Sequence, residues 1–311
     1  MFFERDAAWT RRCEAAVSEI FDRFGSFGLT DETFGLVALQ ERADGGRPAG
    51  FALNGDWRCY PCSVVKAFHL VHALNRIERG QMAVPDDLDQ ALSDMITWSS
   101  NTATNYVIDL LTETTGDTLL EPEAYREWSH RREGLNRFFR DLGWPEWDGC
   151  NIAQKLMGDT RYGREAQFAG RDGSYLNVLT PLVSARLFLE LFAGNLPLNP
   201  RSQKRAGEIL LRDRSRADAH LLSFQIDEFL GGGVPAEAQV WSKAGYTSWT
   251  GNPRTSYYRH DLIRIALPGA APVILSAMTQ GQKITENAAT VFPGIGRALC
   301  DNLLAAEPVP A

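Results

Sequence analysis

The chain has 311 residues, a formal net charge of −7 and 44% hydrophobic residues, an ordinary composition for a folded globular protein. The acidic balance argues against a nucleic-acid-binding protein, because such proteins present a basic surface to phosphates. No apolar run reaches the roughly 18 residues that a membrane-spanning helix needs, so we expect no membrane partner.

The N-terminus and the cysteines together predict the cellular compartment of the protein. Residues 1–6 include the acidic Glu4 and Asp6 where a secretory signal needs a basic start and an apolar run, so we expect a cytoplasmic protein. Five scattered cysteines fit free thiols in a reducing compartment. Cys59 and Cys62 read C-x-x-C, but no second pair completes a zinc site. We therefore expect neither a metal nor a cofactor.

The predicted elements begin with a helix over residues 8–24, where apolar side chains recur every three or four residues. Two short strands follow, at 34–40 and 50–54, separated by Asp44-Gly45-Gly46, which is typical of a hairpin turn. We expect these two strands to pair.

Helical patterns interrupted by Pro and Gly dominate from residue 63 to about 194, and residues 144–181 include a long piece that we expect to be a structured loop. Three later segments read as strands: 239–243, 262–268 and 272–278. A last helix is predicted over 287–305.

This order of elements predicts a single α+β domain over residues 1–311, with an antiparallel sheet flanked by the terminal helices and an all-helical subdomain. The α/β part would comprise about 1–60 and 195–311, and the helical part about 61–194. A catalytic cleft would lie where the two parts meet.

Ser63 and Lys66 form an S-x-x-K motif where a helix over residues 64–78 is predicted to begin. Unpaired N–H groups and the helix dipole favour an alkoxide or oxyanion there, and Lys66 lies on the same helix face. Roughly one S-x-x-K is expected by chance in a chain this long. Taken alone, the motif is better interpreted as an N-cap serine followed by a solvated lysine.

Two further motifs change that interpretation. Ser99-Ser100-Asn101 and Lys243-Ala244-Gly245 follow in the order and spacing of the S-D-N and K-T-G motifs of class A β-lactamases and penicillin-binding proteins. The resemblance runs from about Phe34 to the final helix, with an apparent insertion around 120–133. The chain thus resembles a class A β-lactamase-related serine hydrolase of the penicillin-recognising superfamily, with a β-lactamase and transpeptidase-like fold.

The resemblance implies four catalytic residues. Ser63 would be the nucleophile, and Lys66 would take its proton during acylation. Ser99 would relay a proton to the leaving group, while Lys243 would hold Ser99 and a substrate carboxylate electrostatically.

The resemblance also implies a set of substrate-binding groups. Asn101 would hold the substrate amide. The strand that contains Gly245 would run along the cleft, and the backbone N–H groups of Ser63 and Tyr246 would form an oxyanion hole. Each such donor typically contributes about 3 kcal/mol of transition-state stabilisation.

The sequence departs from the family pattern at three places. Ser100 replaces an acidic residue, and Ala244 replaces a hydroxyl residue that helps to bind the substrate carboxylate in the family. No E-x-x-L-N segment stands at the expected distance before Pro181. Glu165 lies at nearly the right distance and is a candidate water-activating base, the alternative being a solvated loop carboxylate.

We therefore expect a serine hydrolase or acyltransferase that acts on an amide, ester or lactam of a small molecule through a Ser63 acyl-enzyme. Two alternatives stay open: a non-hydrolytic β-lactam-binding or peptide-binding sensor, and a D,D-peptidase. His69 and His72 lie three residues apart on the nucleophile helix, but packing histidines are commoner than metal ligands in such a pattern. The oligomeric state is left open.

Overall fold

The computed structural model describes residues 1–158, 160–170 and 172–304. In these residues an antiparallel sheet has the strand order β2-β1-β5-β4-β3. The strands are β1 (Phe34–Gln40), β2 (Ala49–Leu53), β3 (Gln239–Tyr246), β4 (Tyr258–Ala266) and β5 (Val273–Gln280). The predicted pairing of the first two strands and the α+β class are confirmed.

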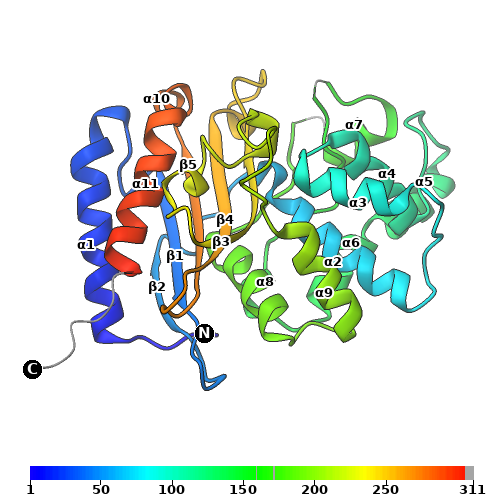
Figure 1. The fold of residues 1–311 in the computed structure, drawn as a ribbon. Coiled ribbons are helices and arrows are strands. Elements are labelled where there is room, and N and C mark those ends of the chain that lie inside the picture. The colour runs from blue at the N-terminus through cyan, green and yellow to red at the C-terminus, as the bar shows by residue number, and fades with distance from the viewer. Residues whose placement is uncertain (159, 171, 305–311) are drawn as a thin grey trace, which may run out of the picture.

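The terminal helices pack together on one face of the sheet (Figure 1). Helix α1 (Ala7–Phe24) buries Trp9, Cys13 and Ile20 on one stripe, as its sequence pattern predicts. Helix α11 (Ala288–Leu303) lies against it, preceded by the short α10 (Gln282–Glu286). Both predicted terminal helices are therefore found, with their starts shifted by one residue, and the predicted end of the last helix at residue 305 lies outside the described residues.

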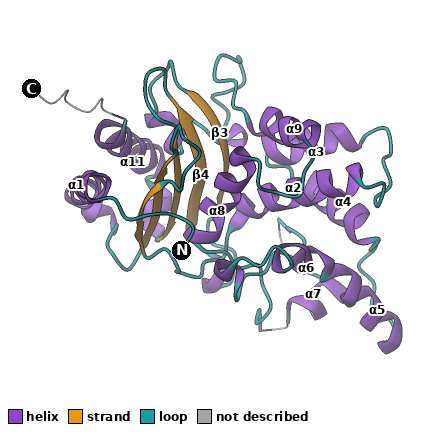
Figure 2. Ribbon diagram, turned by 90° about the horizontal axis from the view of Figure 1, so that it is seen from below, coloured by secondary structure: helices purple, strands orange, loops and turns teal. Residues whose placement is uncertain are grey.

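The other face of the sheet carries α8 (Pro181–Ala193) and then the helical part (Figure 2). Helix α2 (Val65–Glu78) is buried continuously from its start to Asn75 and packs against four other helices. These are α3 (Leu88–Thr97), α4 (Asn101–Thr112), α6 (Gly134–Arg140) and α9 (Pro200–Leu210). The helical part also contains α5 (Pro122–Arg132), which packs on α6, and α7 (Gly163–Ala169). No helix in the described ranges is long and apolar enough to cross a membrane.

The structure departs from the predicted boundaries in three respects. Helix α9 packs on α2 and α3, although it lies beyond the predicted end of the helical part at residue 194. Residues 144–181 contain α7 and a 3-10 turn at Pro145–Trp147. Strand β4 begins at Tyr258, four residues before the prediction. His260 and Asp261 are polar but buried, because other segments pack on both faces of β4: His260 Nε2 lies 2.9 Å from the Tyr60 carbonyl, and Asp261 accepts from the Leu230 N–H.

The two parts of the molecule meet at the start of α2. The 3-10 turn Cys62–Val64 precedes this helix and contacts β3 and β4. Helix α4, which begins at Asn101, packs against α2. The three sequence motifs therefore come from three elements that converge between the sheet and the helices.

Candidate active site

The three motifs converge on a cavity of about 870 Å³ between the helical part and β3. Ser63, Ser99, Asn101 and Tyr246 line it, and so do parts of residues 156–176 and 247–255. Lys66 and Lys243 are fully buried beneath the cavity and contact it through Ser99. The structure thus brings these six predicted site residues together, and Gly245 packs against the Ser63 backbone as a seventh.

Two residues at the site have unusual backbone conformations. Cys62, which directly precedes Ser63, has φ +50°, and Ser99 has φ +54°. This left-handed region is disfavoured for residues with a side chain and persists only where the surroundings impose it. Cys62 is buried against the sheet at the start of the 3-10 turn. Ser63 follows it in this turn and lines the cavity just before α2 begins.

Lys66 forms the floor of the cavity beside the second motif. Its Nζ donates hydrogen bonds to Asn101 Oδ1 at 2.8 Å, to the Ser99 carbonyl at 2.5 Å and to Ser99 Oγ at 3.2 Å. Burial lowers the pKa of Lys66 to about 7, because the charged form loses its hydration. The three acceptors match the three N–H donors of the ammonium form. Near neutral pH part of this lysine is a neutral amine, which donates two of these hydrogen bonds and can accept a proton.

Lys243 approaches Ser99 from the sheet. Its Nζ donates to Ser99 Oγ at 3.0 Å and to Gln225 Oε1 at 2.5 Å. Burial and the nearby positive charges of Lys66 and Arg212 place the pKa of Lys243 well below its ordinary value. The Ser99 hydroxyl accepts from both lysines, so its own proton is left to donate into the cavity.

The geometry of β3 bears on the predicted oxyanion hole. Strand β3 is an edge strand, and the Thr247 N–H donates to the Tyr258 carbonyl on its paired side. Successive N–H groups along a strand alternate in direction, so the Tyr246 N–H points to the open edge. A Cβ at Gly245 would overlap the backbone nitrogen of Ser63, so only glycine permits this approach.

Three buried polar residues support this arrangement without belonging to a motif. Gln225 binds Lys243, and Arg212 donates to Ser242 Oγ at 3.1 Å and to the last carbonyls of α3. Asp261 accepts from the Leu230 N–H at 3.1 Å, and burial raises its pKa to about 7. They come from loops and from β4, so no sequence spacing could have identified them.

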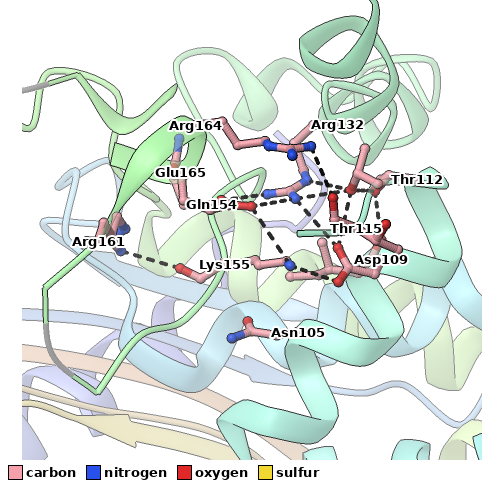
Figure 3. A network of polar contacts seen from close by, with 12 residues as sticks. Asn105, Asp109, Thr112, Thr115, Arg132, Gln154, Lys155, Arg161, Arg164 and Glu165 are labelled. Atoms are coloured by element: carbon pink, nitrogen blue, oxygen red, sulfur yellow. Dashed lines mark hydrogen bonds and ion pairs between the residues drawn. The ribbon is translucent and has the colours of Figure 1, made fainter. Parts of the chain in front are cut away.

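Glu165 does not face the cavity. Its two carboxylate oxygens accept from both terminal nitrogens of Arg132, at 2.8 and 2.9 Å, and both side chains are buried (Figure 3). Lys155 adds a second cation, 2.8 Å from Asp109 and 3.9 Å from Glu165. This geometry argues against Glu165 as a water-activating base, and equally against a solvated carboxylate, because both oxygens are occupied away from solvent.

The two histidines of α2 pack in the interior. His69 Nε2 lies 2.9 Å from the Ile152 carbonyl, and His72 stacks on Phe138 with ring centroids 4.3 Å apart. Burial lowers the pKa of His69 to about 4 and that of His72 to about 3. All five cysteines are free thiols, and burial raises the pKa of Cys62 to about 12. The described residues contain no group of metal-ligating side chains.

Comparisons with known proteins agree with this geometry. The model of a family described as the β-lactamase enzyme family matches residues 86–303, a range that includes the second and third motifs and begins after Ser63 and Lys66. A search of curated proteins finds no match.

Solved structures resemble the whole fold. The β-lactamase from Sphaerobacter thermophilus is 18% identical, with a TM-score of 0.64 over 93% of this chain and 96% of that one. A class A β-lactamase described as the last common ancestor of Gram-negative bacteria is 20% identical, with a TM-score of 0.61 over 92% and 98% of the two chains. At these identities the likeness establishes the fold.

Proposed function

Because this chain belongs to the β-lactamase enzyme family and is a serine hydrolase of that type, we propose that it cleaves an amide, ester or lactam through an acyl-enzyme on Ser63. One observation carries the proposal. The Ser99 hydroxyl accepts hydrogen bonds from two buried lysines at the edge of the cavity that Ser63 lines.

Acylation in this proposal uses Ser63, Lys66 and Ser99. Ser63 Oγ attacks the substrate carbonyl carbon while its proton passes to the neutral Lys66 amine. The negative charge that develops on the carbonyl oxygen is stabilised by the Ser63 and Tyr246 N–H groups. When the bond to the leaving group breaks, Ser99 gives its proton to that group and regains one from Lys66, 3.2 Å away. Lys66 is thus neutral again.

Hydrolysis of the acyl-enzyme requires a base for the attacking water. Glu165 is held by Arg132, whereas Lys66 is returned to its neutral form by acylation and has a pKa near 7. We therefore assign the water proton to Lys66. The withdrawal of Glu165 also supports a second candidate function, a protein that acylates and releases the acyl group slowly, as a sensor would.

The test compares the wild type with Ser63→Ala on a panel of chromogenic esters, anilides and β-lactams, following turnover and intact mass together. Turnover or a mass adduct that disappears in Ser63→Ala is the expected result. Ser248→Ala is a matched control, because Ser248 lines the same cavity and has no assigned role. A variant lacking Ser63 that reacts as fast as the wild type would contradict the proposal.

A further inference from the structure

A second cavity, of about 490 Å³, lies in the helical part at the end of α2 that is remote from Ser63. The last residues of α2, α4 and α5 line it together with α6 (Figure 2). Its volume is in the range of small-molecule sites. Arg76 in this cavity follows Lys66 by ten residues, which is roughly 15 Å along the helix. The two cavities share no lining residue among those described.

The charges around this second cavity do not cancel. Four arginines line it against one glutamate and one aspartate, an excess of two positive charges in a chain whose formal net charge is −7. In the described part of the chain, neither carboxylate forms an ion pair with any of the four arginines. An arginine keeps its charge at any physiological pH, so the cavity carries a permanent positive charge. The charged residues are Arg76, Arg79, Arg131, Arg137, Glu113 and Asp141.

These arginines make few contacts with the rest of the protein. Within the described ranges, the side chains of Arg79 and Arg137 form neither a hydrogen bond nor an ion pair. Arg76 has one long hydrogen bond, from a terminal nitrogen to Gln81 Oε1 at 3.4 Å, and its enclosed Nε leaves the terminal nitrogens as the donors that a ligand could use. Arg76 and Arg137 are half-buried, so water hydrates them incompletely. An anion in the cavity would supply the missing acceptors.

A buried polar residue without a partner also lines this cavity. His72 is 5% exposed, and neither of its ring nitrogens forms a hydrogen bond among the described residues. Its ring is held by stacking on Phe138, and since Nδ1 is enclosed, only Nε2 can reach the cavity. Burial and the charge of Arg76 lower the pKa of His72 to about 3, so the ring is neutral and can donate one hydrogen bond. Buried polar side chains rarely lack a partner, which favours a ligand here.

The positions of the arginines also have a local explanation. Arg76, Arg131 and Arg137 lie in the last turns of α2, α5 and α6, where a cation compensates the negative end of the helix dipole. This effect acts on each helix separately and does not require the cations to share a cavity. Arg140, in the same last turn of α6, does not line the cavity. The convergence of cations from three helices therefore needs a second cause.

We propose that this second cavity binds a small phosphorylated molecule, with the arginines around its phosphoryl group and the apolar part of the wall against its organic group. A phosphate monoester carries nearly two negative charges at neutral pH, which matches the excess of positive charge. Guanidinium groups bind phosphate oxygens in pairs. The apolar part of the wall consists of Leu111, Phe138, Leu142 and Pro197. The proposal does not depend on the reaction at Ser63.

The experiment titrates phenyl phosphate into the protein calorimetrically and compares it with phenyl sulfate, which has the same shape and one negative charge less. We expect saturable binding of phenyl phosphate with a Kd of about 1 mM or tighter. Phenyl sulfate should bind about tenfold more weakly or worse, and added salt should weaken both. Phthalate places two carboxylates on one ring and separates a phosphate site from a general anion site. Equal affinity for phenyl phosphate and either of the other two, or no saturable binding, would overturn the proposal.

Substitutions locate the binding. Arg137→Gln should weaken the binding of phenyl phosphate by about 10- to 100-fold, the range for hydrogen bonds to a charged group. Arg140→Gln is the matched control, because Arg140 lies in the same last turn of α6 outside the cavity, and it should leave the affinity unchanged. An equal loss in Arg137→Gln and Arg140→Gln would reduce the arginines to helix-dipole compensation and contradict the proposal.

Two further variants make the result decisive. Arg161→Gln tests whether phenyl phosphate binds in the active-site cavity instead, because Arg161 lines that cavity. Binding that is lost in Arg161→Gln and kept in Arg137→Gln would overturn the proposal. Thermal unfolding without ligand shows whether each variant folds. If Arg137→Gln does not fold, Arg79→Gln takes its place, because Arg79 is exposed and its side chain makes no contact that folding requires.

Discussion

Two clusters of buried charge lie on either side of the cavity wall, and they differ in their counter-ions. Beneath the cavity, Lys66 and Lys243 bind hydroxyl, amide and carbonyl oxygens, and neither forms an ion pair with a carboxylate in the described part of the chain. Behind the wall, Arg132 and Lys155 are matched by Glu165 and Asp109 at 2.8 Å each.

Under the proposed function, this difference separates a reactive cluster from a structural one. Burial without a counter-ion lowers the pKa of a lysine until the neutral amine becomes available for proton transfer. Burial with a counter-ion keeps both partners charged and makes each dependent on the other. The comparison therefore predicts opposite consequences of substitution in the two clusters.

The largest effect is expected from Lys66→Met. Removing the proton acceptor should slow acylation of Ser63 by about a hundredfold to ten-thousandfold, the usual contribution of a positioned base. The free energy of unfolding should stay equal or rise, because the variant no longer buries a lysine without a carboxylate partner. Labelling rates with a fluorophosphonate and urea denaturation measure the two quantities. If Lys66→Met lowered the free energy of unfolding and left the labelling rate unchanged, Lys66 would be a structural residue and not a proton acceptor.

Glu165→Gln should show the opposite behaviour. It removes the carboxylate that binds both terminal nitrogens of the buried Arg132 and leaves this guanidinium only Asp109 at 3.7 Å. The free energy of unfolding should fall by about 3–5 kcal/mol, as measured by urea denaturation. Labelling of Ser63 in the folded protein should change little.

The double variant Arg132→Met with Glu165→Leu is the control for Glu165→Gln, and it should regain most of the lost stability. Acyl-enzyme that accumulates in Glu165→Gln, with stability unchanged, would instead restore Glu165 as the water-activating base.

The pH dependence sharpens the comparison further. The pKa of Lys66 is lowered from 10.5 to about 7 on folding, so between these values the unfolded chain binds more protons than the folded one. This lysine therefore makes the free energy of unfolding rise with pH from about 7 to about 10.5. Acylation should rise through pH 7 as well.

The measurement is urea denaturation at pH 7 and pH 9.5 for the wild type and Lys66→Met. Lys243 and the cysteines are present in both proteins. The difference between the two pH dependences of the unfolding free energy therefore gives the contribution of Lys66. We expect a steeper rise in the wild type, and parallel curves would show that Lys66 keeps its ordinary pKa.

The smallest effect is expected at the surface. Arg23 pairs with Glu19 at 2.8 Å, but both side chains are more than a third exposed. Arg23→Gln should change the free energy of unfolding by about 0.5 kcal/mol or less, because water and salt screen such pairs. Urea denaturation of Arg23→Gln and of Glu165→Gln compares the exposed ion pair with the buried one. An equal loss of unfolding free energy in the two variants would contradict the expected difference between exposed and buried pairs.

The sequence alone determined the local elements and the motif residues. The apolar stripe of residues 8–24 and the paired strands of residues 34–53 follow from side-chain periodicity, which is a property of neighbouring residues. Ser63, Ser99 and Lys243 were recognisable because each stands in a short pattern whose order resembles that of a known family.

Only the tertiary structure decided which charges are paired. Glu165 meets Arg132, 33 residues away, and Gln225 meets Lys243 across a loop. Arg161 lines the cavity, whereas Glu165, four residues later, binds Arg132 away from it. The physical reason is that burial and pairing depend on which distant segments the fold brings together, and these two conditions set the charge and the reactivity of each group.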